Sequence, residues 1–410
     1  MRSQALISAA LLLACLTSPV SSQAVDSAGP PGSELTVYLM TMGQGDLVWE
    51  RYGHNAIGIR DDRAGTNVLY NWGLFSFEEP GFIGNFLRGE NMYWMGGQDF
   101  ASTLAEYRMR NRTVEVQVLN LSPPQRLALY DFIKFNSREE NKYYRYNYFL
   151  DNCSTRVRDA LDSVLGGAIR QRTDTLQTGF TLRFHALRLM AGLPLTTVGV
   201  NIALGSPTDR PITAWEEMFI PMRLRDWVRE IRVPDDSGRM VPLVMSERVL
   251  FEAQRPPERL APPLSVVPLG IIGLLLASGL AWLGKGRKGA VGASVVAGIV
   301  LGTLGMVLAF LRLMTEHVAA YGNTNIFVYN PLWWILLLAM LVARRSPRAR
   351  GAVYFIATGI ALLASFGVVA PFLPGFRQGS FAVIALAAPL AITAAWIIRE
   401  RHRPAVLQPA

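Results

Sequence analysis

Cys153 is the residue of this chain best suited to nucleophilic chemistry. It lies in the segment YNYFLDNCSTRVRD, at the predicted start of a helix that Asp151 or Asn152 would cap. The first turn of a helix presents unpaired N–H groups and the positive end of the dipole, so this position favours the thiolate. The alternative is a buried structural thiol, because unpaired cysteines are among the most buried residues. The polar neighbours on both sides favour the functional interpretation.

A thiol nucleophile needs a base, usually a histidine that a third polar residue orients. The chain has four histidines. His54 follows a glycine at the start of a predicted strand, and His317 lies in a loop between two apolar segments. His185, in FHALRLM, is predicted to pack on a helix, and His402 lies in the C-terminal tail. A histidine at a strand start is more often structural than catalytic, so the role of His54 depends on what the fold brings to it.

The elements that must position these residues are strands first and helices afterwards. Apolar alternation predicts strands over 35–40, 56–60, 68–72, 92–96 and 113–119. An Asp- and Gly-rich turn joins the second and third strands and predicts a hairpin. SPPQ at 122–125 predicts a capped helix that runs to about Asn136. This order predicts an α+β domain.

The remainder of the domain is predicted to be partly helical. The cysteine helix would bury a stripe formed by Val157, Ala160 and Leu161. Further helices are expected over 184–191, 215–219 and 224–231, with a β-like stretch at 240–245. The external domain is therefore assigned to 35–253, followed by a Pro-rich linker at 254–265.

Five apolar segments are long enough to cross a membrane, which takes about 20 residues. They span 266–284, 290–311, 326–343, 352–373 and 380–398. The third is short and carries an Asn-Pro pair near its start, so its first residue is the least defined. A short tail, 399–410, follows the last span.

Basic clusters orient these spans. They follow the first, third and fifth spans and comprise Lys285, Arg287, Lys288, Arg344, Arg345, Arg348, Arg350, Arg399, Arg401 and Arg403. The positive-inside rule places them in the cytoplasm, so the 35–253 domain and the 312–325 loop lie outside. With Glu400, the clusters carry as much charge as the whole chain, +9. No basic excess is left to indicate a nucleic-acid partner.

The N-terminus predicts export. Residues 1–24 contain Arg2 and a short apolar stretch and are typical of a secretory signal. LLAC at 12–15 is similar to a lipobox, which would make Cys15 a lipid-bearing N-terminus; ordinary cleavage near 22–24 is the alternative. Either route leaves a multi-pass inner-membrane protein with a periplasmic domain. An oxidising compartment favours paired cysteines, so an unpaired Cys153 is informative there.

Three motifs resemble a known family. The sequences YGHNAI at 52–57, YNWGLF at 70–75 and DNCSTR at 151–156 are similar to the Lnb family, which contains lipoprotein N-acyltransferases of the Bacteroides type. GSPTD at 205–209, FIP at 219–221 and the loop with His317, Asn323 and Asn325 also fit it. The histidine precedes the cysteine, as in the permuted NlpC-like papain superfamily. The resemblance implies a permuted papain-like domain followed by five transmembrane helices.

The resemblance also implies roles for individual residues. Cys153 would be the nucleophile and His54 its base. The third member would lie on the strand after the histidine strand, where Asn71 is the best polar candidate, although Tyr70 and Trp72 are equally close in the sequence.

Four further residues are predicted to contact the substrate. Many related hydrolases have Asp before the cysteine, whereas Asn152 would either cap the helix or help to bind the oxyanion. Ser154 and Arg156 follow the cysteine. Arg156 or Arg158 would face a phosphate or, alternatively, solvent. His317 would approach from the membrane side or remain part of a plain surface loop.

The implied activity is acyl transfer from a phospholipid, through a Cys153 thioester, to an amine, expected to be the N-terminal cysteine of a lipoprotein. A cell-wall amidase or peptidase would use the same thiol, but one span would suffice to tether it. A non-enzymatic membrane protein with an inactive papain-like domain is the third alternative. No metal-ligand spacing, phosphate-binding glycine loop or nucleotide fingerprint occurs, so neither a metal nor a cofactor is predicted. Acyl donor, acceptor and oligomeric state stay open.

Overall fold

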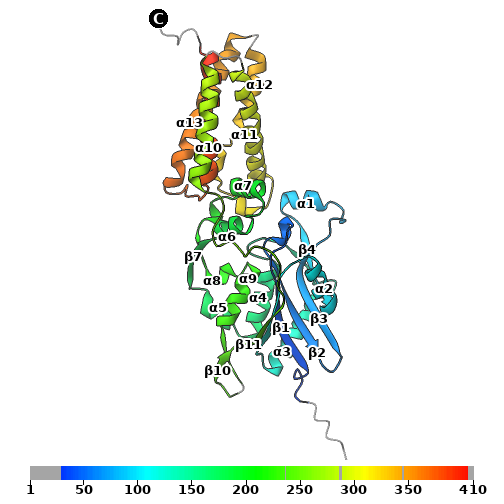
Figure 1. Cartoon of the computed structure of the whole chain (residues 1–410). Coiled ribbons are helices and arrows are strands. Elements are labelled where there is room, and N and C mark those ends of the chain that lie inside the picture. The colour runs from blue at the N-terminus through cyan, green and yellow to red at the C-terminus, as the bar shows by residue number, and fades with distance from the viewer. Residues whose placement is uncertain (1–28, 236, 286–288, 344–345, 405–410) are drawn as a thin grey trace, which may run out of the picture.

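The computed structural model describes residues 29–404 except 236, 286–288 and 344–345. Figure 1 shows two parts, a bundle of long helices and an α+β domain at one end of it. The predicted signal segment 1–24, with Cys15, lies outside the described residues, as does the end of the tail at 405–410.

A seven-stranded antiparallel sheet organises the α+β domain. Its strand order is β11-β5-β1-β2-β3-β4-β6. The strands are β1 (Leu35–Met42), β2 (His54–Asp61), β3 (Thr66–Leu74), β4 (Met92–Asp99), β5 (Val114–Leu119), β6 (Tyr143–Arg145) and β11 (Val244–Phe251). The predicted hairpin is confirmed, since β2 pairs with β3 in the register that sets Ala56 opposite Asn71.

The two faces of the sheet bury different side chains, because successive residues of a strand point to opposite faces. On one face, Leu39 and Ile57 pack against α3 (Pro123–Asn136) and α4 (Cys153–Val164). On the other face, a cluster around Met40 packs against α2 (Phe100–Met109). A register slip of one residue would exchange the faces, so burial on both sides holds the register.

Helices α1 (Phe82–Arg88) and α2 lie between strands, and the predicted order of strands first and helices afterwards missed them. Helix α1 has seven residues and is apolar nearly all round, so it has no amphipathic period to detect. Helix α2 packs its apolar residues on the β1–β3 face instead. The class is still α+β, because every strand pairing in the main sheet is antiparallel.

The cysteine helix α4 begins as the sequence predicts. Of the two candidate caps, Asn152 is the N-cap, and its Oδ1 accepts the N–H groups of Ser154 and Thr155 at 2.9 Å. The predicted inward stripe is confirmed, since Val157, Ala160 and Leu161 are all buried. The predicted capping box of α3 is also present, with Gln125 accepting the Ser122 N–H.

Short elements complete the domain. They are α5 (Ala168–Thr173), β7 (Gln177–Thr181), α6 (Leu182–Leu189), α7 (Pro194–Ala203), β8 (Pro211–Thr213), α8 (Ala214–Glu217), α9 (Pro221–Glu230), β9 (Arg232–Pro234) and β10 (Met240–Pro242). The β-like stretch predicted at 240–245 is therefore divided between β10 and the edge strand β11.

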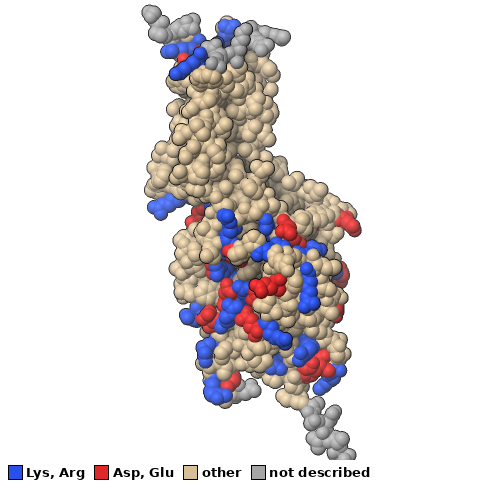
Figure 2. Space-filling view, viewed as in Figure 1, with Lys and Arg blue, Asp and Glu red and all other residues tan. Residues whose placement is uncertain are grey.

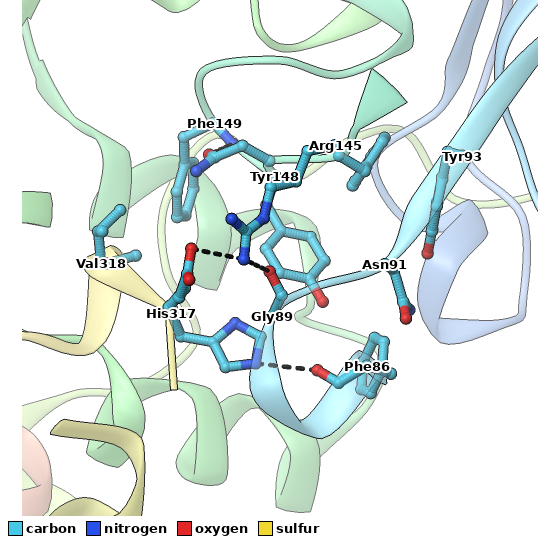
Figure 3. A pocket seen from close by; sticks show the side chains of 13 residues that line it. Phe86, Gly89, Asn91, Tyr93, Arg145, Tyr148, Phe149, His317 and Val318 are labelled. Carbon is cyan, nitrogen blue, oxygen red and sulfur yellow. Dashed lines mark hydrogen bonds and ion pairs between the residues drawn. The ribbon is translucent and has the colours of Figure 1, made fainter. Parts of the chain in front are cut away.

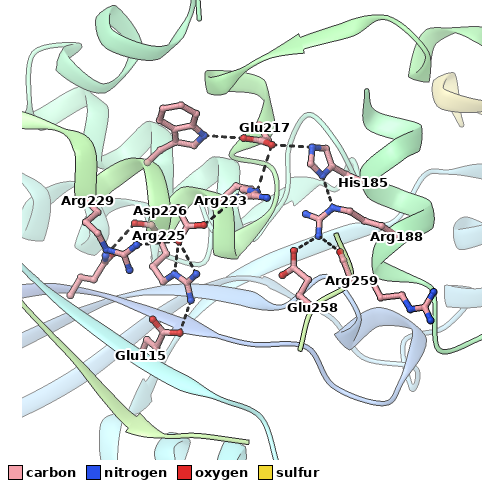
Figure 4. Close-up of polar contacts among 12 residues, drawn as sticks. Glu115, His185, Arg188, Glu217, Arg223, Arg225, Asp226, Arg229, Glu258 and Arg259 are labelled. Atoms are coloured by element: carbon pink, nitrogen blue, oxygen red, sulfur yellow. Dashed lines mark hydrogen bonds and ion pairs between the residues drawn. The ribbon is translucent and has the colours of Figure 1, made fainter. Parts of the chain in front are cut away.

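Figure 4 shows that His185 belongs to a buried ionic network. Its Nδ1 accepts the Arg188 Nε–H at 2.9 Å, which leaves the proton on Nε2, 3.0 Å from the Glu217 carboxylate. Burial lowers the pKa of His185 although Glu217 opposes the shift. Arg188 also pairs with Glu258 and donates to the Arg259 carbonyl, so the network holds the linker against α6. His185 thus has the packed position predicted for it.

Five helices are long and apolar enough to cross a membrane among the described residues. They include α10 (Val266–Gly284), α11 (Ala290–Leu313), α12 (Leu332–Ala343), α13 (Pro347–Val369) and α14 (Phe381–Arg401). Helix α12 starts late because Pro331 lacks an N–H donor; a short 3₁₀ helix, Thr324–Phe327, precedes it in the third span. Figure 2 shows basic residues at the bundle end away from the domain, as the orientation requires.

The loop after α11 joins the helix bundle to the α+β domain. The Gly205 N–H donates to the Ala319 carbonyl at 2.8 Å, and the Nδ2 groups of Asn323 and Asn325 donate to the Ile202 carbonyl. A Cβ on Gly205 would lie only 1.9 Å from the Tyr321 carbonyl oxygen. The GSPTD motif and the Asn323–Asn325 loop therefore lie against each other, and backbone contact holds the two parts together.

Candidate active site

Cys153 lies at the start of α4 where this helix meets the beginning of β2. Its side chain is buried, and its Sγ accepts a hydrogen bond from the backbone N–H of Asn55. The Asn55 side chain donates to Thr41, and its Oδ1 lies 2.9 Å from the Ser154 hydroxyl oxygen. Asn55 thereby fastens the thiol end of α4 to β1 and β2. Sequence reasoning gave Asn55 no role, although it follows His54 directly.

His54 is the first residue of β2, and its ring is oriented by β3. Its Nε2 lies 3.0 Å from the Oδ1 of Asn71. The Nδ2 of Asn71 donates to the Leu69 carbonyl and to Gln98, which turns its oxygen towards the histidine. His54 Nε2 therefore carries the proton and donates it, and Nδ1 is the basic nitrogen.

Asn71 is the one of the three sequence candidates that contacts His54. Trp72 donates its indole N–H to Asn136, and Tyr70 bonds to Tyr130. Both side chains point to the other face of the sheet from Asn71, as strand alternation requires. The structure thus brings Asn71 and His54 together. His54 directly precedes Asn55, whose backbone N–H donates to the Cys153 thiol.

The end of β3 closes over the thiol. A Cβ on Gly73 would lie 3.5 Å from both the Cys153 Cβ and the Tyr146 ring, and the positive φ of 86° favours glycine there. Among the described residues, no hydrogen bond joins Sγ directly to His54. Contacts of this kind are often long in a resting site and tighten when substrate binds.

Burial sets the resting protonation states. It raises the pKa of Cys153 to about 11, although the Asn55 N–H and Arg112 oppose the shift. Burial also lowers the pKa of His54 to about 4, although the hydrogen bond to Asn71 opposes this. The expectation that the helix start favours a thiolate is wrong for the resting site, because desolvation outweighs the dipole. The pair rests as neutral thiol and neutral imidazole.

Arg112 is a buried cation beside this pair that the sequence did not indicate. Its Nε–H donates to the Gly43 carbonyl at 2.9 Å, and its guanidinium lies over the Tyr107 ring. Its charge lowers the pKa of both Cys153 and His54. Its short Asn-Arg-Thr context carries no motif, so only the fold shows where this charge lies.

A pocket of about 200 Å³ lies between the α+β domain and the loop after α11 (Figure 3). Tyr146 lines it and also flanks Gly73 beside the thiol. His317 lines it from the membrane side, where its Nε2 lies 3.0 Å from the Phe86 carbonyl and its ring stacks on Tyr148. Figure 3 shows Arg145 nearby, paired with Glu316. His317 thus reaches the pocket, while its substrate role stays a prediction.

The other predicted substrate contacts are already engaged within the protein. Asn152 caps α4 with its oxygen and donates its Nδ2 hydrogens to the Tyr148 and Phe219 carbonyls. Of its two predicted roles, Asn152 therefore has the helix cap, because its amide has no donor left for an oxyanion. The Ser154 hydroxyl is fully buried and donates to Met218 O. These residues position the helix.

The two arginines after Cys153 are paired as well. Arg156 forms a bidentate pair with Asp151 and lies over the Tyr144 ring. Arg158 is buried, donates to the Trp215 carbonyl and pairs with Asp159. Neither arginine faces open solvent as a free cation. Within the described part of the chain, no three His, Cys, Asp or Glu side chains come together in a way that could hold a metal ion.

Comparisons with known proteins agree with this architecture. Residues 29–190 match the family model of the Lnb N-terminal periplasmic domain, and residues 258–403 match that of the Lnb transmembrane domain. Curated proteins and solved structures give no match. The first match holds Cys153, His54 and Asn71, and the second holds all five membrane helices. The chain is a membrane protein with a periplasmic domain and belongs to the Lnb family.

Proposed function

We propose that this protein is an inner-membrane acyltransferase that carries an acyl chain on Cys153. The donor is a phospholipid, and the acceptor is the free amine of a lipoprotein's N-terminal cysteine. The observation that carries the proposal is that Cys153 accepts from the N–H of Asn55, the residue that follows His54, while Asn71 orients the His54 ring and Tyr146 links the thiol to a pocket lined by the loop after α11. Donor and acceptor are both lipid-embedded, which gives five spans a purpose beyond tethering.

In the first half-reaction, Sγ of Cys153 attacks the carbonyl carbon of the acyl ester while Nδ1 of His54 takes the thiol proton. Asn71 accepts from Nε2 and holds the ring in this tautomer. The Ser154 and Thr155 N–H groups are occupied by the cap, so the N–H of Cys153 itself is the helix-start donor for the oxyanion. The ester C–O bond breaks, and the lysophospholipid leaves with the proton from His54.

In the second half-reaction, the acceptor amine attacks the thioester and His54 takes the amine proton. The C–S bond breaks, the amide forms, and His54 returns the proton to the thiolate. The net change converts an ester and an amine into a lysophospholipid and an amide. A neutral imidazole is required at the start of both halves, which agrees with the low pKa of His54.

Intact-mass spectrometry of the full-length protein tests the proposal. The protein is incubated with phosphatidylethanolamine vesicles in the absence of acceptor. We expect a mass increase of one acyl group, located on Cys153, labile to hydroxylamine and absent from Cys153→Ala. A synthetic diacylated lipopeptide with a free α-amine should discharge the thioester and gain the acyl group. Met240→Ala, on the distant strand β10, serves as the matched control.

Other outcomes would overturn the proposal. Absence of any acyl group on Cys153 at saturating phospholipid would contradict it. If the wild-type protein then released peptides from peptidoglycan and Cys153→Ala did not, the amidase alternative would hold. Absence of both activities would indicate an inactive papain-like domain.

A further inference from the structure

Helix α1 and the segments packed on it expose large apolar side chains. Ile83 is 70% exposed and Leu87 52%, and the neighbouring Phe77 and Trp49 are 59% and 50% exposed. Residues 80–87, PGFIGNFL, carry no charge, and the exposed Glu78 and Glu79 separate them from Phe77 along the chain. Contiguous exposed apolar surface of this kind marks an interaction site.

The position of α1 identifies the partner surface. The carbonyl of Arg88, the last residue of α1, accepts the Glu316 N–H at 2.8 Å, and Glu316 follows the end of α11 by only three residues. Figure 1 shows α1 at the level where the membrane helices begin. In Figure 2 the mostly uncharged surface of the bundle continues over this end of the domain. The apolar surface of α1 is therefore continuous with the surface that faces lipid.

Aromatic contacts lead from this surface to the thiol. The ring centroids of Trp49 and Phe77 are 5.4 Å apart, and those of Phe77 and Phe82 are 5.1 Å apart. Phe75 stacks on Phe82 at 5.7 Å and on Tyr93 at 5.1 Å.

The last contact of this series reaches the site. Tyr93 stacks on Tyr146 at 4.3 Å, and Tyr146 lies beside Gly73 next to Cys153. The rings from Trp49 to Tyr146 thus form a continuous row of contacts, and the inner rings, Tyr93 and Tyr146, line the pocket.

We propose that α1, with Trp49 and Phe77, inserts into the periplasmic leaflet of the membrane that α10–α14 cross, and that lipid acyl chains reach the Cys153 pocket along these rings. The second half of this inference rests on the proposed function, whereas the insertion does not. Aromatic side chains next to uncharged apolar residues are typical of segments that lie in a membrane interface. The leaflet, rather than another protein, is the occupant because this surface continues directly from the membrane spans.

Site-directed spin labelling tests the insertion. A nitroxide is attached at I83C in full-length protein that also carries C15S and C153S, reconstituted in phospholipid vesicles. We expect collisions with oxygen to exceed collisions with a water-soluble nickel chelate. A label at M240C, on β10 far from the bundle in Figure 1, should show the reverse. Equal nickel accessibility at both positions would overturn the insertion and point to a protein partner or bare solvent.

Charge substitution tests the acyl path. In I83D/L87D, two carboxylates would have to enter the interface, so Cys153 acylation from vesicles should fall about tenfold. Acylation by a water-soluble short-chain ester should be unchanged, and Met240→Asp should affect neither reaction. Equal losses with both donors would overturn the path, since the damage would then lie in the site itself. The two halves of the inference can fail separately. If the label at residue 83 lies in lipid but the wild-type protein never acylates Cys153, the proposed function is refuted and the insertion stands.

Discussion

The Nε2 of His54 lies 3.0 Å from the Oδ1 of Asn71, across the pair formed by β2 and β3. Because Asn71 donates its own hydrogens to Leu69 O and Gln98, its oxygen has one orientation, and so does the imidazole tautomer. The basic nitrogen is thereby defined before any substrate binds. We therefore expect Asn71 to act as a positioning residue, with an effect that can be separated from that of the thiol.

Replacing Asn71 should slow acyl transfer without removing the nucleophile. In Asn71→Ala we expect about a 10²-fold lower rate, the low end of what a positioned acid–base group contributes. Iodoacetamide should still label Cys153. The rate of Cys153 acylation, followed by intact mass, measures the effect. Gln98→Ala removes only one partner of Asn71 and should cost much less; full activity in Asn71→Ala would contradict the assigned role.

The pKa values of the two site residues predict a wide pH plateau. With the pKa of His54 lowered to about 4 and that of Cys153 raised to about 11, the neutral pair persists between these values. Activity should fall only as His54 becomes protonated near pH 4. Alkylation of Cys153 should keep rising towards pH 11, because the thiolate is the reactive form. An alkylation rate already level at neutral pH would indicate a resting ion pair instead.

Substitutions of Arg112 test whether its charge contributes to this pH dependence. Its positive charge lowers the pKa of Cys153, so Arg112→Gln should move the alkylation profile to higher pH. The pKa of His54 should also rise, since the same charge opposes protonation of the ring. Arg112→Lys retains a cation and should restore much of the profile. Identical profiles in all three proteins would show that Arg112 has no electrostatic influence on the site.

Asn152 should prove to be a helix cap. Asn152→Asp keeps the oxygen that accepts from Ser154 and Thr155 but loses the donors to the Tyr148 and Phe219 carbonyls. The buried Phe219 carbonyl then lacks this partner, at a cost of about 1–3 kcal/mol, and the part-buried Tyr148 carbonyl loses its partner as well. We expect a lower unfolding temperature by circular dichroism, with residual acylation by the folded fraction. A variant as stable as the wild type but unable to acylate would instead support the substrate contact predicted from the sequence.

A substitution at Gly205 tests the junction between the α+β domain and the helix bundle. In Gly205→Ala the new Cβ would meet the Tyr321 carbonyl oxygen, so the loop after α11 must move and its contacts weaken. We expect faster proteolysis near residues 315–325 than in the wild type. Gly199→Ala, in α7, is the matched control, because a Cβ there has open space and alanine favours a helix. Equal proteolysis of both variants would show that the junction tolerates the displacement.

Local patterns were sufficient for much of the fold. Alternation predicted β1, β2, β3 and β5, and a capping residue before an apolar stripe predicted α4, because these signals lie within a few residues. Hydropathy predicted α10 to the residue, since a span is defined by length and composition alone. Helix α1 was not predicted because it has no amphipathic period. The place of β11 in the main sheet was not predicted either, because it depends on pairing with β5, which is distant in the chain.

By itself, the sequence determined the membrane spans, the placement of the α+β domain and the family to which both domains belong, and it gave Cys153 and His54 as the predicted nucleophile and base. The tertiary structure decided which third residue orients His54, because Asn71, Tyr70 and Trp72 differ only in the face of β3 on which they lie. It also decided the resting charge of Cys153, since burial is the sum of contacts from several segments. Arg112, Asn55 and His317 approach the site from segments far apart in the chain, and only folding sets the distances between them.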